Sequence, residues 1–320
     1  MFQAVDEKQK DAIWNDAREL WLSRQKSKNT AKSYQESLNS LLRFSSKKPW
    51  EIKTRDVSQW LADQQKRGCA QRTIAARIAG AKSFYDFIIV EYVYSEVGGE
   101  EEEHRLREDN PVAAFKPPQI DSYSAAVCWD AEQAGAFLKA ISTDNMAGKR
   151  DKALFTGYLL MGLRNSELRQ LRYENIERPS AGLIEIVYDG KGKPHQRKEL
   201  LPPVYEAIMA FAAAENKYEG FVFHRYDSAG RIVDLPISDQ TVRNSLKYYA
   251  RKAGLRTEGL RVHSLRHTAA FLRHEAGDDL ESIRDFLKHN NVATTKIYLQ
   301  KIKPKPDKAW MTVAEMLEII

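Results

Sequence analysis

The stretch His263-Ser264-Leu265-Arg266-His267 decides how this 320-residue sequence is interpreted. Residues three apart share one face of a helix, so His263 and Arg266 can point at one ligand. A guanidinium binds phosphate oxygens bidentately, and a nearby imidazole can move a proton. His263 and His267 also have the spacing of a zinc-binding helix, but that helix requires Glu directly after its first His, where this chain has Ser264. The pattern therefore favours a phosphate site over a metal site.

A second arginine stands upstream, in Gly162-Leu163-Arg164-Asn165-Ser166-Glu167-Leu168. Gly162 predicts the end of one helix, and Asn165 predicts the N-cap of the next. Arg164 is then expected at a helix N-terminus, where backbone N–H groups favour an anion. Glu167 is expected to orient a catalytic side chain or to cap its helix. The alternative for Arg164 is a surface arginine paired with a carboxylate.

Two further stretches contain residues of chemical interest. Leu183 to Tyr188 is predicted to be a strand, with a turn at 190–192 and a return strand from Arg197 to Leu201. Downstream, Asn290-Asn291 breaks a helix, and a new short helix can present Tyr298 nine residues after His289. A tyrosine by itself is usually a core or interface residue, so Tyr298 gains meaning only from its neighbours.

These stretches together resemble the active-site motifs of the tyrosine recombinases, a family that includes phage integrases and chromosome-dimer resolvases. Their order along the chain is that of the family, although each motif alone is unspecific. The matching stretches are Gly162-Leu163-Arg164-Asn165-Ser166-Glu167-Leu168, Gly190-Lys191-Gly192-Lys193, His263-Ser264-Leu265-Arg266-His267, Leu287-Lys288-His289 and Thr294-Thr295-Lys296-Ile297-Tyr298. One departure is Lys288, which replaces the family's usual glycine in the turn that carries His289.

The resemblance implies a site-specific DNA recombinase or integrase that cleaves and rejoins strands through a 3′-phosphotyrosyl intermediate. It implies a catalytic set made of Arg164, Lys191, His263, Arg266, His289 and Tyr298. In that set the arginines hold the non-bridging phosphate oxygens and Tyr298 attacks phosphorus. The unperturbed pKa of tyrosine is near ~10, so His263 is the candidate base. Lys191 is the candidate proton donor, with Lys193 as the alternative.

The resemblance requires no metal ion or nucleotide, so no cofactor is expected. Two other functions stay open at this point. One is relaxation of supercoils by a type IB topoisomerase, which the short length and small helical N-terminal block disfavour. The other is a non-catalytic DNA-binding regulator, which the intact catalytic set disfavours.

The first part of the chain is predicted to be helical and basic. Tyr34, Leu38, Leu41 and Leu42 recur at helical spacing. Asn29-Thr30 and Tyr34 also resemble the family's core-binding (SAM-like) domain, which extends the resemblance over about residues 14–320. Residues 1–95 carry 17 Lys and Arg against 11 Asp and Glu. The candidate contacts to DNA phosphates, with a solvated surface as the alternative, are Arg24, Lys26, Lys28, Lys32, Arg72, Arg77 and Lys82.

The sequence predicts a helical DNA-binding domain over 1–95, a linker over 96–119 and a catalytic domain over 120–320. Residues 96–109 carry 2 basic against 7 acidic residues, and Gly, Pro and like charge argue against packed structure there. The expected fold class is mainly α with a small antiparallel sheet. The resemblance implies that the two domains form a C-shaped clamp on double-stranded DNA.

The remaining features concern location and assembly. No run of 18 apolar residues and no secretory signal are visible, so a cytoplasmic protein is expected. Cys69 and Cys128 fit no metal spacing. Thr312 and Glu315 form a capping box, and Met316, Leu317 and Ile320 form an apolar stripe. The resemblance favours docking of this Thr312–Ile320 tail helix on a neighbouring subunit of a DNA-bound homotetramer, with docking on its own domain as the alternative.

Overall fold

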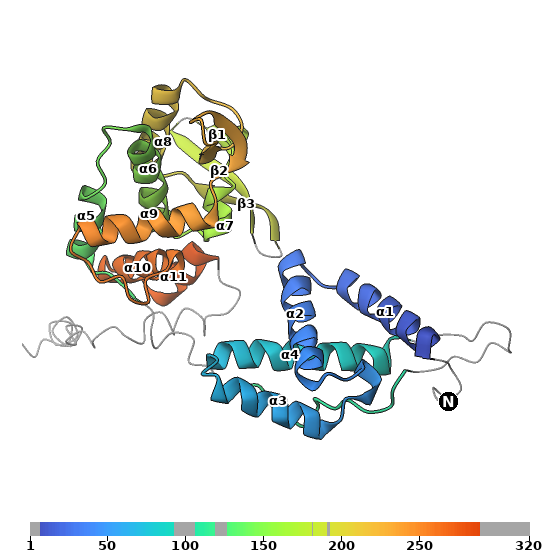
Figure 1. Ribbon diagram of the computed structural model, residues 1–320. Coiled ribbons are helices and arrows are strands. Elements are labelled where there is room, and N and C mark those ends of the chain that lie inside the picture. Colours follow the sequence, from blue (N-terminus) through green and yellow to red (C-terminus); the bar gives the residue numbers. More distant parts are fainter. Residues whose placement is uncertain (1–6, 93–105, 119–126, 181, 191–192, 289–320) are drawn as a thin grey trace, which may run out of the picture. The chain divides into compact units, whose positions relative to one another are not determined.

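A computed structural model describes residues 7–92, 106–118, 127–180, 182–190 and 193–288 of the chain. The chain divides into two compact units, Met1–Asp121 and Ser122–Ile320 (Figure 1). Each unit has a hydrophobic core of its own. None of the helices in the described ranges is long and apolar enough to cross a membrane.

The described part of the first unit is helical throughout. Its elements are α1 (Glu7–Ser23), α2 (Lys28–Ser45), the 3-10 turn η2 (Pro49–Glu51), α3 (Thr54–Lys66) and α4 (Gln71–Val90). Helix α2 begins where the Ser27 side chain accepts a hydrogen bond from the Thr30 N–H, at 3.1 Å. This all-helical unit agrees with the apolar spacing in the sequence.

The core of the first unit forms where α2 and α4 pack closely. A Cβ at Gly80 would lie 2.6 Å from the Ser37 Cβ, so only glycine allows this approach. Trp21 and Trp60 are fully buried, and their indole N–H groups donate to Ser83 and Ser40 at 3.2 Å. The large rings therefore fill the core without leaving their polar atoms unpaired.

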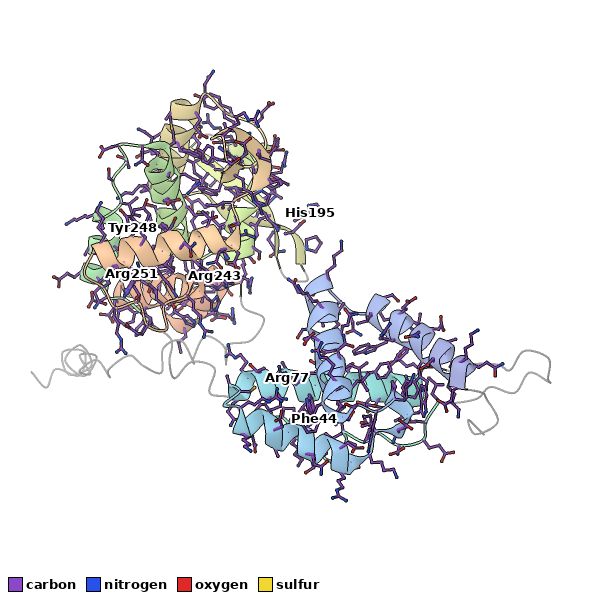
Figure 2. All side chains as sticks on the ribbon, in the orientation of Figure 1. Phe44, Arg77, His195, Arg243, Tyr248 and Arg251 are labelled. Carbon is purple, nitrogen blue, oxygen red and sulfur yellow. The ribbon has the colours of Figure 1, made fainter. Side chains whose placement is uncertain are left out.

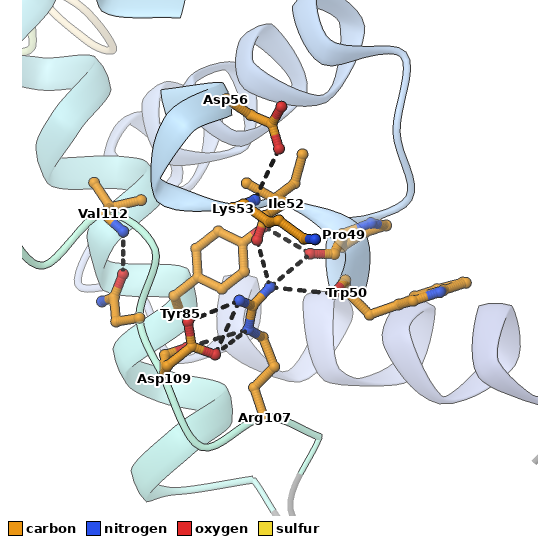
Figure 3. Close-up of polar contacts among 10 residues, drawn as sticks. Pro49, Trp50, Ile52, Lys53, Asp56, Tyr85, Arg107, Asp109 and Val112 are labelled. Carbon is orange, nitrogen blue, oxygen red and sulfur yellow. Dashed lines mark hydrogen bonds and ion pairs between the residues drawn. The ribbon is translucent and has the colours of Figure 1, made fainter. Parts of the chain in front are cut away.

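Part of the predicted linker packs on the first unit instead of connecting freely. Leu106 and Val112 are buried in its core. The Arg107 guanidinium donates to the carbonyl oxygens of Trp50 and Ile52, at 3.3 and 2.8 Å, and lies over the Tyr85 ring (Figure 3). The expectation of an unpacked connection over 96–119 is therefore wrong for residues 106–118.

The second unit combines helices with two small sheets. Its helices are α5 (Ala131–Lys139), α6 (Met146–Met161), α7 (Asn165–Arg169), α8 (Pro202–Glu215), α9 (Asp239–Lys252), α10 (Val262–Glu275) and α11 (Leu280–Leu287), with the 3-10 turn η3 (Tyr173–Asn175). Its strands are β1 (Ile176–Ser180), β2 (Leu183–Gly190), β3 (Lys193–Glu199), β4 (His224–Tyr226) and β5 (Ile232–Pro236). These helices and strands confirm the predicted mainly α fold with small antiparallel sheets.

The larger sheet has the strand order β1-β2-β3, and all of its pairs are antiparallel. Ile186 pairs with Lys198, and Gly190 pairs with Lys193 at the tip of the hairpin. The return strand thus starts earlier than the predicted Arg197. Helix α6 is buried on most of its sides, which places it at the centre of the unit.

Candidate active site

Arg164 stands at the start of α7, as the sequence predicted. It is the N-cap residue of that helix, and its side chain is about one-third exposed. The expected cap, Asn165, is instead the first helical residue. Its side chain accepts from the Tyr158 hydroxyl at 2.6 Å and donates to Asp239. Asn165 thus holds α7 against α6 and the start of α9, while Arg164 takes the exposed end of the helix.

Glu167 fixes both the backbone and the side chain of Arg164. Its carboxylate is almost fully buried, and one oxygen accepts from the Arg164 backbone N–H at 2.7 Å. The other oxygen accepts from Arg164 Nη1, also at 2.7 Å. This ion pair offsets part of the charge of the Arg164 guanidinium. It uses Nη1, so the remaining N–H donors of the guanidinium are not bound to Glu167. Glu167 therefore caps α7 and also holds the Arg164 side chain in place.

His263 and Arg266 lie in the first turns of α10. The segment begins after Arg261, whose backbone N–H donates to the Ser264 hydroxyl at 3.1 Å. Ser264, the residue that excludes a zinc-protease helix, is thus part of the helix cap. The His263 and His267 rings meet edge to face, with centroids 4.9 Å apart.

Backbone carbonyls hold the Arg266 guanidinium in place. Arg266 is only 3% exposed. Its Nη1 donates to the Gly162 carbonyl at 2.5 Å, and its Nη2 donates to the Leu287 carbonyl. These contacts join α10 to the ends of α6 and α11. A positive charge fixed in this way needs no reorganisation to meet a developing anion.

The surroundings of His263 keep its imidazole neutral. Burial lowers its pKa to about 4, and the positive charges of Arg266 and Arg164 act in the same direction. His263 nevertheless lies exposed at the surface of its unit. The three predicted residues Arg164, His263 and Arg266 therefore share one electrostatic environment. A neutral imidazole beside two guanidiniums can accept a proton while the guanidiniums hold an anion.

The other members of the predicted catalytic set lie outside the described residues. These are Lys191, His289 and Tyr298, together with the tail Thr312–Ile320. The described chain reaches the last turn before His289, where Lys288 adopts a left-handed conformation with φ 50°. This conformation is the one that the family's usual glycine adopts readily, so the substitution changes the residue without removing the turn.

The predicted phosphate contacts of the first unit occupy α2, α4 and the loop before α2. Most of them are exposed. Two have partners within the unit. Arg24 pairs with Glu91 at 2.7 Å and lies over the Phe87 ring, and Arg77 donates to the Cys69 thiol at 3.6 Å. Arg24 and Arg77 therefore also have structural contacts.

Helix α9 presents a basic face that the sequence interpretation missed. Arg243, Lys247 and Arg251 are exposed at successive four-residue intervals, and Tyr248 beside them is 57% exposed. Figure 2 labels Arg243, Tyr248 and Arg251 on this helix. The opposite face of α9 is buried. The four-residue spacing of the three cations was the available signal. Because the N-terminus of α9 is bonded to Asn165, this face belongs to the same unit as Arg164.

Both units of the chain match known protein families. Residues 129–304 match the phage integrase family, and residues 17–91 match the SAM-like N-terminal domain of phage integrases. The chain is 26% identical over 283 residues to tyrosine recombinase XerC of Xanthomonas campestris, covering 87% of this chain and 80% of that protein. It is 28% identical over 284 residues to tyrosine recombinase XerD of Neisseria meningitidis, covering 87% and 89%.

Solved structures show the same fold. A post-cleavage complex of the XerH site-specific recombinase with its difH substrate matches with a TM-score of 0.67 and 17% identity, over 91% of this chain and 80% of that one. A lambda integrase tetramer bound to a Holliday junction matches with a TM-score of 0.69 and 15% identity, over 93% and 79%. The likeness extends over both units of the chain.

Proposed function

The chain belongs to the phage integrase family of tyrosine recombinases, and from this premise we propose that it cleaves and rejoins DNA at specific sites through a covalent bond to Tyr298. The observation that carries the proposal is the shared environment of Arg164, His263 and Arg266. That environment has the charge and the neutral base that phosphoryl transfer requires.

In the proposed reaction, the Tyr298 oxygen attacks phosphorus and the bond to the 5′-oxygen breaks. Arg164 and Arg266 hold the non-bridging oxygens. His263, whose lowered pKa keeps it unprotonated at neutral pH, takes the tyrosine proton. Lys191 on the β2–β3 hairpin gives a proton to the 5′-oxygen, and His289 hydrogen-bonds the phosphate. The phosphotyrosyl bond conserves the energy of the broken bond, so a 5′-hydroxyl from another strand can reverse the step.

DNA is the partner of this activity, and we propose that both units contact one duplex. The exposed lysines and arginines of α2 and α4 support this for the first unit. The face of Arg243, Lys247 and Arg251 supports it for the second. Neutralising phosphates with such residues releases counterions and supplies affinity without sequence preference.

We also propose that four copies assemble on paired sites through the tail helix Thr312–Ile320. Its apolar stripe of Met316, Leu317 and Ile320 is the support for this proposal. A helix with one apolar side is stable only when that side is covered. Docking on a neighbour would make the assembly depend on this segment.

Covalent capture tests the reaction without knowledge of the target site. Nicked duplexes prepared from the genome that encodes this chain are incubated with the protein, and DNA that stays bound in SDS is sequenced. We expect wild type to capture a defined sequence and Tyr298→Phe to capture none, because phenylalanine has no nucleophilic oxygen.

Tyr248→Phe is the matched control, since Tyr248 is an exposed tyrosine of the same unit. It should capture the same sequence as wild type. If Tyr298→Phe still forms the bond, Tyr298 is not the nucleophile. If wild type shifts the DNA in a native gel but never forms the bond, the chain is a DNA-binding protein without this reaction. Relaxation of a supercoiled plasmid without strand exchange would instead indicate a topoisomerase.

A further inference from the structure

A lysine occupies an inward position of the β2–β3 hairpin where an apolar residue is expected. Lys198 pairs with Ile186, which is buried, and paired residues share one face of a sheet. Its neighbour Arg197 faces the other way and binds Glu177 and Glu185 at 2.7 and 3.1 Å. Burying an ammonium is costly, so its position calls for a specific partner.

The partner is the last turn of α11. Lys198 Nζ donates to the Phe286 carbonyl oxygen and lies 3.8 Å from the centroid of the Phe286 ring. The Arg273 guanidinium lies 4.4 Å from the same centroid. The ring is also close to Gly162, where a Cβ would meet it at 2.6 Å. Phe286 is thus fixed among the hairpin, α10 and the end of α6.

Lys198 and Arg266 together cap the C-terminus of α11. The last carbonyls of a helix have no partner within the helix and carry partial negative charge. Lys198 takes the carbonyl of Phe286, and Arg266 takes that of Leu287. The next residue is Lys288 in its left-handed turn, and His289 follows it. These two cations therefore define where the chain leaves α11.

We propose that Lys198 is a positioning residue for DNA cleavage, fastening the β2–β3 hairpin to the end of α11 so that Arg266 keeps its place. The inference rests on the proposed function above. Lys198 itself does not touch the phosphate in this scheme. It acts by supporting Arg266, which shares the α11 terminus with it.

The charge of Lys198 is balanced against its surroundings. Burial, together with the positive charges of Arg266, Lys288 and Arg273, lowers its pKa to about 7, while the negative charge of Glu167 opposes the shift. These groups come from α10, the end of α11 and α7. The ammonium form, which binds carbonyls and aromatic faces more strongly, is therefore present below about pH 7 and lost above it.

The test measures single-turnover formation of the covalent complex at saturating protein, on the nicked duplex that wild type captures. Lys198→Met keeps the apolar stem and removes the donor. We expect it to bind the duplex like wild type in a native gel but to cleave about ten- to a hundredfold more slowly, as for a misplaced catalytic group. Lys198→Arg should restore most of the rate. Arg197→Met, on the outer face of the same strand, should leave the rate unchanged.

The pH profile separates positioning from simple stability. Arginine stays charged at every pH used, so the ratio of the Lys198→Arg rate to the wild-type rate should rise as pH passes about 7. A constant ratio, or a folded Lys198→Met protein that cleaves at the wild-type rate, overturns the inference. Melting curves of each variant establish that it is folded. If wild type itself forms no covalent complex on any duplex, the proposed function fails rather than the role of Lys198.

Discussion

At the scale of single residues, the site depends on charges that are held in place before any substrate arrives. The Arg266 guanidinium is bound to two backbone carbonyls, and the Arg164 guanidinium is bound to Glu167. Both lower the pKa of His263. The same two charges that would hold a phosphate thus keep the neighbouring base unprotonated at neutral pH.

This coupling predicts the effect of removing one charge. Arg164→Gln should raise the pKa of His263 above its wild-type value of about 4, because one of the charges that oppose its protonation is gone. The measurement is an NMR titration of the His263 ring proton, assigned with a His263→Gln variant. Because the wild-type pKa is about 4, protonation of His263 should not limit the rate of cleavage by wild type until the pH falls toward that value.

Arg243→Gln provides the control for this titration. It removes an exposed charge of the same unit from a residue that does not contribute to the His263 shift. An unchanged His263 pKa in Arg164→Gln would contradict the shared environment described here. A rise in both variants would mean that the total charge of the unit, and not the nearby guanidinium, sets the pKa.

Sequence motifs predict candidate ligand-binding residues more directly than they predict the residues that hold those candidates in place. Arg164, His263 and Arg266 were predicted because their residue types and spacing suit phosphate chemistry. Lys198 was not, because its role depends on strand register and on a contact with Phe286 far along the chain. Asn165 was predicted as the N-cap of α7, but the N-cap is Arg164, one residue earlier. The Asn165 side chain is hydrogen-bonded to Tyr158 and Asp239 instead.

At the scale of elements, tertiary contacts decide the structure of the segment that joins the two units, against the prediction from its local composition. Proline, glycine and acidic residues predicted an unpacked linker over 96–119. Residues 106–118 nevertheless pack on the first unit, because Arg107 donates to the carbonyl oxygens of Trp50 and Ile52 and Val112 is buried in the core. The helices of the first unit were predictable from their apolar spacing, and the β2–β3 hairpin from an apolar run followed by a glycine-containing turn, although β3 starts at Lys193 and not at the predicted Arg197.

The helix predicted for Thr312–Ile320 gives the test that belongs to this scale. Replacing Met316 and Leu317 by Glu should destroy its apolar stripe, since burying each such side chain contributes roughly 1.5–3 kcal/mol. If the stripe docks on a neighbouring subunit, sedimentation of the protein on paired sites should show fewer chains per complex. Covalent capture on a single nicked duplex should persist. A lower melting temperature with unchanged assembly would mean that the stripe docks on its own unit. Lys308→Glu, outside the stripe, is the control.

At the scale of the whole molecule, the charge is distributed over two basic parts separated by an acidic segment. Residues 1–95 have 17 basic against 11 acidic residues, and residues 96–109 reverse that balance. Helix α9 gives the second unit a basic face of its own. A duplex bound by both units should release counterions at both of them, so the salt dependence of binding reports each contribution.

The last prediction compares these contributions in the full chain. One variant carries Arg243→Gln, Lys247→Gln and Arg251→Gln on α9, and the other carries Lys28→Gln, Lys32→Gln and Arg72→Gln on the first unit. Each phosphate contact removed should flatten the slope of log affinity against log salt by about 0.9. Both variants should therefore lose up to about 2.7 from a slope measured by gel shift. A third variant with Lys139→Gln, Arg231→Gln and Arg256→Gln has the same net charge and should keep the wild-type slope.

The pattern among the three variants decides between specific contacts and general attraction. Equal losses in all three would mean that net charge alone attracts DNA, since the control residues are exposed but lie outside α9. A loss confined to the first-unit variant would remove α9 from the DNA interface. Losses in the α9 and first-unit variants, with none in the control, require phosphates to contact both units. That result would explain why one chain keeps a small helical unit joined to its catalytic unit: each binds backbone that the other does not reach.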